Sequence, residues 1–72
     1  MVRTLAQQKS ALTRAKKKGT AAVLAECKRT QAEWDSQEWA DTHRVCRGDW
    51  PDDWTRWQRA WNDAITKEGY AR

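Results

Sequence analysis

The sequence predicts an all-α protein, a small three-helix assembly with a helical hairpin and a tryptophan-rich core. Three observations lead to this fold class. The 72 residues are rich in Ala, Gln, Glu, Lys and Arg, which are good helix formers. No stretch alternates apolar and polar residues as a half-exposed strand would. Tryptophan replaces the scarce branched aliphatic residues, and a chain of this length (1–72) forms a single small domain.

The first helix is expected near residues 2–18. Its apolar stripe is thin, recurs at helical spacing and consists of Leu5, Gln8, Leu12 and Ala15. The three residues Lys16–Lys18 end it, where cations complement the helix dipole. Gly19 can then adopt a left-handed conformation and reverse the chain, which makes the first two helices a hairpin. Because the stripe is thin, we expect this helix to dock loosely.

The second helix is expected near residues 20–47. One helical face carries Val23, Cys27, Trp34 and Val45. Glu38 and Asp41 intrude on that face, so two alternatives remain open. The segment is either one continuous helix, or it breaks near 35–37, where Asp35 and Glu38 form a capping-box-like pair.

The third helix, near residues 51–67, has the clearest pattern. Pro51 suits a first helical position, and the two aspartates that follow it would lie at the positive end of the helix dipole. The apolar stripe then repeats at helical spacing through Trp54, Trp57, Trp61 and Ala64 or Ile65. Gly48 and Gly69 are expected to end the second and third helices as C-caps.

Tryptophan is the most informative residue, because all six lie within 34–61 and a minimal core needs fewer. The expected core members are Trp34, Trp54, Trp57 and Trp61. Trp39 and Trp50 fit the helical stripes poorly, so we expect them to be exposed. Exposed tryptophans are enriched among the residues that dominate binding energy at interfaces. These two residues are therefore the predicted partner-binding positions.

Charge divides the chain into a basic helical segment, 1–29, and a tryptophan-rich segment, 30–67. Residues 1–29 hold eight Lys and Arg and one acid, whereas residues 30–72 hold six Lys and Arg and nine acids. Such polarity can attract nucleic-acid phosphates, and the alternative is a solvated basic face. The candidate phosphate contacts are Arg3, Lys9, Arg14, Lys16, Lys17, Lys18, Lys28 and Arg29.

Residue types that carry chemistry are sparse. His43, Cys27 and Cys46 are the three soft ligands, one fewer than a structural zinc site uses, and no glycine-rich phosphate loop exists. We therefore expect no enzymatic activity, catalytic residue, cofactor, metal or small-molecule substrate. The longest apolar run is the five residues 21–25, so we expect neither a membrane span nor a secretory signal, and a cytoplasmic location in a bacterial host.

Several motifs resemble a group of short hypothetical proteins from actinobacteria and their phages. The resemblance covers residues 8–65, and its most specific part is the tryptophan–proline–double-aspartate run. It departs from the group at 36–49, which look like an irregular insertion, and at Trp61, where a leucine is expected. The matching motifs are Ala11–Ala15 through Gly19, Val23–Ala25, Glu33–Asp35, Trp50–Trp54 and Trp57–Ala60. The group has no assigned activity, so the resemblance implies a helical fold and a phage origin.

Together these features predict a small, non-enzymatic, phage-derived interaction protein. It would bind a protein partner, or a second copy of itself, through a tryptophan-rich helical surface. The alternative function is that of a DNA-binding accessory protein that uses the basic N-terminal hairpin.

Overall fold

A computed structural model of the chain describes residues 2–68, which form four helices and no strand. The helices are, in order, α1 (Leu5–Lys18), α2 (Thr20–Trp34), α3 (Gln37–His43) and α4 (Thr55–Glu68). The all-helical prediction is confirmed over these residues. There is one helix more than predicted, because the expected second helix divides into α2 and α3.

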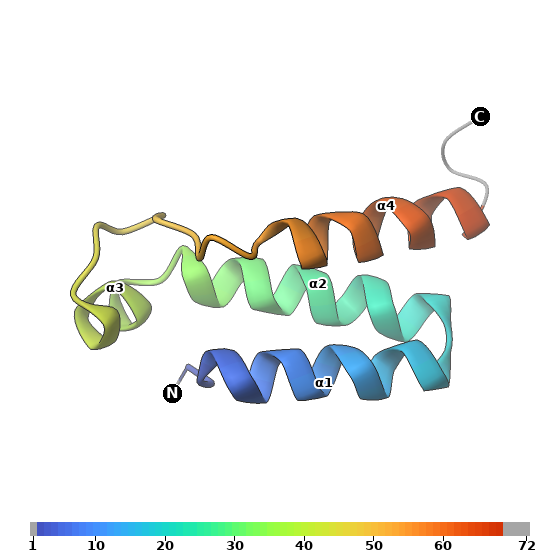
Figure 1. The fold of residues 1–72 in the computed structure, drawn as a ribbon, viewed down its shortest axis with the longest axis horizontal. Helices are drawn as coiled ribbons and strands as arrows, with labels where there is room; N and C mark the ends of the chain where they lie inside the picture. Colours follow the sequence, from blue (N-terminus) through green and yellow to red (C-terminus); the bar gives the residue numbers. More distant parts are fainter. Residues whose placement is uncertain (1, 69–72) are drawn as a thin grey trace.

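The helix α2 lies between α1 and α4 and packs against both (Figure 1). It runs antiparallel to each of them, so the three longer helices alternate in direction. The short helix α3 lies at the end of this layer where α2 finishes. No helix within residues 2–68 combines the length and the apolar character that crossing a bilayer requires.

The predicted hairpin through Gly19 is confirmed. Thr4 caps α1: its hydroxyl accepts from the Gln7 N–H, and the Gln7 side chain accepts from the Thr4 N–H. This cap explains why α1 begins at Leu5 rather than near residue 2. The N–H of Gly19 donates to the Ala15 carbonyl at 3.1 Å. The left-handed conformation expected at Gly19 is wrong, since Gly19 has φ 133° and ψ 178°, an extended region open almost only to glycine.

The expectation that α1 docks loosely is wrong. Four of its residues are buried against the rest of the protein: Gln8, Ala11, Leu12 and Ala15. Arg3, just before the helix, pairs with Glu26 and Glu33 of α2, and its Nε lies 3.0 Å from a Glu33 oxygen. The sequence pattern understated the contact because a buried glutamine and an arginine outside the helix contribute to it.

This ion pair shifts the pKa of both partners. The hydrogen bond with Glu33 raises the pKa of Arg3 further, against the opposing effect of burial. Burial raises the pKa of Glu33, but the hydrogen bonds and the charge of Arg3 outweigh it, so that pKa lies below its ordinary value of 4.5. Both shifts favour the charged pair that joins the start of the chain to α2.

Of the two alternatives for the second helix, the break near 35–37 is the one observed. The cap of α3 is Ser36, not the predicted Asp35, because the Ser36 hydroxyl accepts from the Trp39 N–H at 3.1 Å. The helix ends at Arg44 in a left-handed conformation with φ 54°. Residues 44–54 are not helical, so the expectation of a helix to 47 with a C-cap at Gly48 is wrong.

The predicted start of the last helix at Pro51 is also wrong, because α4 begins at Thr55. Pro51 belongs to a turn in which its carbonyl accepts from the Trp54 N–H at 3.0 Å. The preceding residue, Trp50, is held by Asp35, so the chain arrives at Pro51 along the end of α2 and needs this turn before α4 can begin. The predicted C-cap at Gly69 lies outside the described residues.

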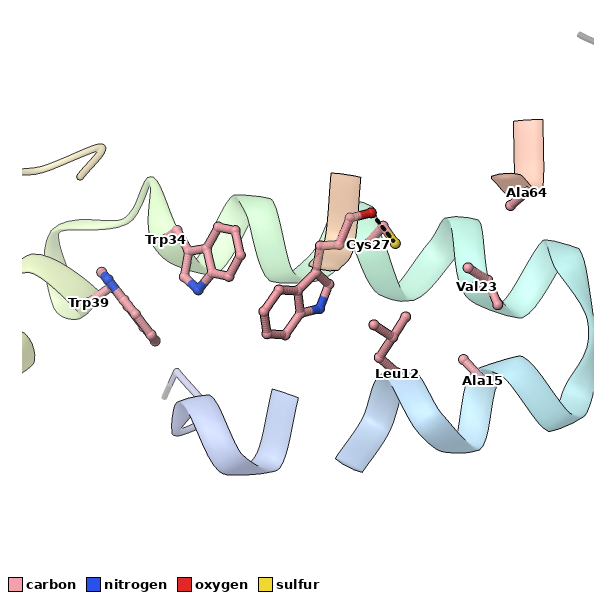
Figure 2. Close-up of a cluster of buried hydrophobic side chains, with 8 residues drawn as sticks. Leu12, Ala15, Val23, Cys27, Trp34, Trp39 and Ala64 are labelled. Atoms are coloured by element: carbon pink, nitrogen blue, oxygen red, sulfur yellow. Dashed lines mark hydrogen bonds between the residues drawn. The ribbon is translucent and has the colours of Figure 1, made fainter. Parts of the chain in front are cut away.

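The core changes character along its length. The rings of Trp34 and Trp39 fill the end near α3, whereas Leu12, Ala15 and Val23 pack nearer the hairpin (Figure 2). Cys27 lies between these regions, and its Sγ is 3.6 Å from the Trp57 carbonyl oxygen of α4. Burial raises the pKa of the Cys27 thiol to about 11. Cys27 is thus a small core residue at the contact between α2 and α4.

Candidate functional site

Trp34 is the centre of an aromatic cluster at the α3 end of the core. Its ring centroid lies 4.9 Å from that of Trp57 in an edge-on arrangement, and 5.9 Å and 6.3 Å from those of Trp50 and Trp39. Its indole N–H donates to the Gln8 side-chain oxygen at 3.0 Å. Trp34 and Trp57 are 2% and 3% exposed, which confirms their predicted place in the core.

The expectation that Trp39 is exposed is wrong, since it is only 2% exposed. The prediction extended the helical phase of α2 through residue 39, whereas the break at Ser36 resets that phase and turns Trp39 inward. His43 covers its outer side, with stacked rings whose centroids are 3.7 Å apart. Trp39 therefore offers almost no exposed surface to a partner.

Trp50 is exposed, as predicted, at 37% of its surface. It is nevertheless fixed in place, because its indole N–H donates to the Asp35 carboxylate at 3.0 Å. Its ring lies 5.9 Å from those of Trp34 and Trp54. Arg47, in the same loop, donates to the Asp35 backbone carbonyl at 3.1 Å. Trp50 therefore presents an indole face at the surface that a hydrogen bond and two neighbouring rings hold.

A groove of about 400 Å³ opens beside these rings, between the C-terminal half of α2, Trp50 and α4. We call it the indole groove. Five indoles, three carboxamides and one isoleucine line it: Gln31, Trp34, Trp50, Trp54, Trp57, Gln58, Trp61, Asn62 and Ile65. None of these nine side chains is charged. The groove is thus a mainly apolar surface that contains three neutral hydrogen-bonding groups, the carboxamides.

The helix α4 supplies most of the groove because it has two apolar faces. Trp57 and Ala64 face the core and are buried, whereas Trp54 and Trp61, which were predicted to be core residues, are only half-buried. The groove face begins at Trp54, the residue just before α4, and continues along Gln58, Trp61 and Ile65, at spacings of four, three and four residues. These spacings keep the side chains on one side of a helix.

Sequence reasoning missed the three carboxamides of the groove, Gln31, Gln58 and Asn62. Polar residues on a tryptophan-rich helix look like its solvent face, so neither their position nor their shared surface was predicted. The 4-3-4 spacing through Gln58 was the available signal, because it continues the tryptophan stripe through a polar residue.

The candidate phosphate contacts are distributed over the hairpin. Lys16, Lys17 and Lys18 lie together at the end of α1, next to Gly19. Lys28 and Arg29 follow the start of α2 by eight and nine residues, about 12–14 Å along the helix. Within the described residues, no ion pair involves Arg14, Lys16, Lys17, Lys18, Lys28 or Arg29. The other two candidates, Arg3 and Lys9, are paired with acids.

In the part of the chain that the structure describes, no three His, Cys, Asp or Glu residues gather as a metal site would require. Comparison of the chain with protein-family models, with curated proteins and with solved structures finds no match.

Proposed function

We propose that the chain is a small, non-catalytic, phage-derived interaction protein that binds another polypeptide through the indole groove. One observation carries the proposal: five indoles, two of them from the buried core, line an open groove that contains no charged side chain. Contiguous apolar surface of this kind is typical of binding sites. The resemblance to short actinobacterial and phage proteins supports the origin.

The geometry of Trp50 favours binding further. A side chain that is free in solution loses rotamer entropy when a partner immobilises it, at a cost of about 0.5–1.5 kcal/mol. Asp35 and the neighbouring rings of Trp34 and Trp54 already hold Trp50. A partner would therefore meet a preorganised aromatic surface and would avoid most of this cost.

Site-specific photo-cross-linking tests the proposal. A benzophenone amino acid replaces Gln58, an exposed residue of the groove, or Ala25, an exposed residue of α2 outside it. After irradiation of cells that produce the protein, we expect covalent adducts with a polypeptide from position 58, identified by mass spectrometry, and few from position 25. Equal yields from both positions, or no polypeptide adduct at position 58, would overturn the proposal.

A second candidate function, binding to DNA, is favoured by the six unpaired cations of the hairpin. Cations that are not held in ion pairs can neutralise phosphates, and binding should then weaken steeply with salt. The variant Lys16/Lys17/Lys18→Glu should weaken binding to duplex DNA at least tenfold, whereas Trp61→Gln should not change it. An affinity that falls less than twofold between low and physiological salt would reject this function.

A further inference from the structure

We infer that the polypeptide in the indole groove is a second copy of this chain, so that the protein is a two-fold symmetric dimer with α4 packed against α4. This inference rests on the proposed function, since it names the partner of the same groove. Three properties of the groove carry it: its lack of charge, its hydrogen-bonding groups and the spacing of its residues along α4.

The lack of charge is the first property. In a two-fold dimer the same patch meets itself, so any charged residue near the axis faces a like charge. The chain contains 24 charged residues among 72, counted as 14 Lys and Arg plus 10 Asp and Glu, yet none lines the indole groove. Four other grooves in the described residues each contain at least two charged side chains. The indole groove is thus the one of these five that two identical copies can share without repulsion.

The hydrogen-bonding groups are the second property. Gln31, Gln58 and Asn62 carry carboxamides, and each of these offers both donors and an acceptor. A carboxamide can therefore pair with its own symmetry mate, which neither a carboxylate nor an ammonium group can do. The polar side chains of the groove are the kind that a two-fold contact satisfies.

The spacing is the third property. Positions 54, 58, 61 and 65 follow the alternation of four and three residues by which one helix meets another along a seam. The middle of this stripe lies between Gln58 and Trp61, and a two-fold axis there makes the two helices antiparallel. Half-buried Trp61, which lines the groove, would then pack against the groove of the other copy.

The rest of the molecule agrees with an antiparallel arrangement. Lys16 lies beside the C-terminal half of α4, where it lines a groove with Asp63, Ala64 and Lys67, and Asp63 pairs with Lys67 at 3.4 Å. Antiparallel packing places the Lys16–Lys18 ends of the two copies at opposite ends of the dimer, which limits the repulsion between two chains of net charge +4. A second apolar contact also adds buried area to a core of the size that often needs oligomerisation.

Analytical ultracentrifugation with a charge swap at Gln58 tests the inference. We expect wild-type protein to sediment at twice the 8.4 kDa mass of one chain. Gln58→Glu and Gln58→Lys should each raise the dissociation constant at least tenfold, because like charges then meet beside the axis. Mixing the two variants in equal amounts should restore the dimer.

Thr13→Glu and Thr13→Lys serve as matched controls, since Thr13 is exposed on α1 outside the groove and should leave the dimer unchanged. Unchanged helical circular dichroism would establish that the Gln58 variants remain folded. A dimer that is indifferent to charge at Gln58, or one that the mixture fails to restore, would overturn the inference. A wild-type monomer up to about millimolar concentration would also overturn it, and cross-links from Gln58 to another protein would then still support the proposed function.

Discussion

At the end of the protein near α3, large aromatic rings fill the core, whereas at the hairpin end small aliphatic side chains do so. Trp34 and Trp39 are buried at the first end, with the Trp57 ring against Trp34, and Ala15 and Val23 are buried at the second. The aromatic end combines a seven-residue helix with a non-helical loop, while the hairpin end consists of the regular helices α1, α2 and α4. Large rings therefore fill the core where the backbone is irregular, and small side chains between closely packed helices fill it where the backbone is regular.

The two ends also differ in how well their polar groups are satisfied. Within the described residues, the buried side-chain donors without an acceptor are Gln8 Nε2 and Trp57 Nε1, and both lie against Trp34. A buried donor of this kind costs about 1–3 kcal/mol. At the aromatic end, burial of large rings therefore leaves two polar donors unsatisfied. This end also reaches the surface, where it forms the indole groove.

The largest expected effect comes from Trp34→Ala at the aromatic end. The change removes ring contacts with three other tryptophans and leaves a cavity, which should cost about 3–5 kcal/mol and unfold much of the population. Val23→Ala at the hairpin end removes two methyl groups and should cost about 2 kcal/mol. Urea denaturation followed by circular dichroism measures both, and equal losses would show that the two ends contribute alike.

An intermediate effect is expected from Gly19→Ala at the hairpin. A Cβ at Gly19 would have no atom within 4 Å, so the cost arises only from the backbone at φ 133°. We expect a loss of about 1–3 kcal/mol in the free energy of unfolding, measured by the same denaturation. Stability within about 0.5 kcal/mol of wild type would contradict the conformation of this turn.

The smallest effect is expected from Arg3→Ala, which tests a polar contact between α1 and α2. Loss of the charged hydrogen bonds to Glu33 should cost about 1–2 kcal/mol at neutral pH. The pKa of Glu33 is lower in the folded state than its ordinary 4.5, so its stabilisation is complete above pH 4.5 and disappears as pH falls through the folded pKa. Stability measured against pH should fall there in wild type and less steeply in the variant. Parallel curves would argue against the pair.

Local signals predicted the hairpin end well. The lysines before Gly19, and the glycine itself, act through the helix dipole and backbone freedom, which neighbouring residues alone determine. The break before α3 was predicted as one of two alternatives. Its signal is also local, because the capping residues lie next to the break in the sequence. The docking of α1 was missed, since Arg3 and Gln8 reach partners more than twenty residues away.

The aromatic end was harder to predict, because long-range contacts decide it. Trp50 bonds to Asp35 and delays the start of α4, which no pattern around Pro51 indicates. The helical phase that misplaced Trp39 was correct for α2 but did not continue beyond Ser36. The indole groove escaped prediction because it combines residues from α2, a loop and α4, including polar ones that looked solvent-facing.

Chemical labelling of the buried Cys27 thiol between α2 and α4 can measure how often these two helices separate. Cys46 is exposed, so an alkylating reagent should modify it in the native state, whereas Cys27 has both a shielded sulfur and a pKa of about 11. Alkylation of Cys27 therefore requires α4 to separate from α2. The ratio of the two labelling rates would report how often that separation occurs in the intact protein, without denaturant.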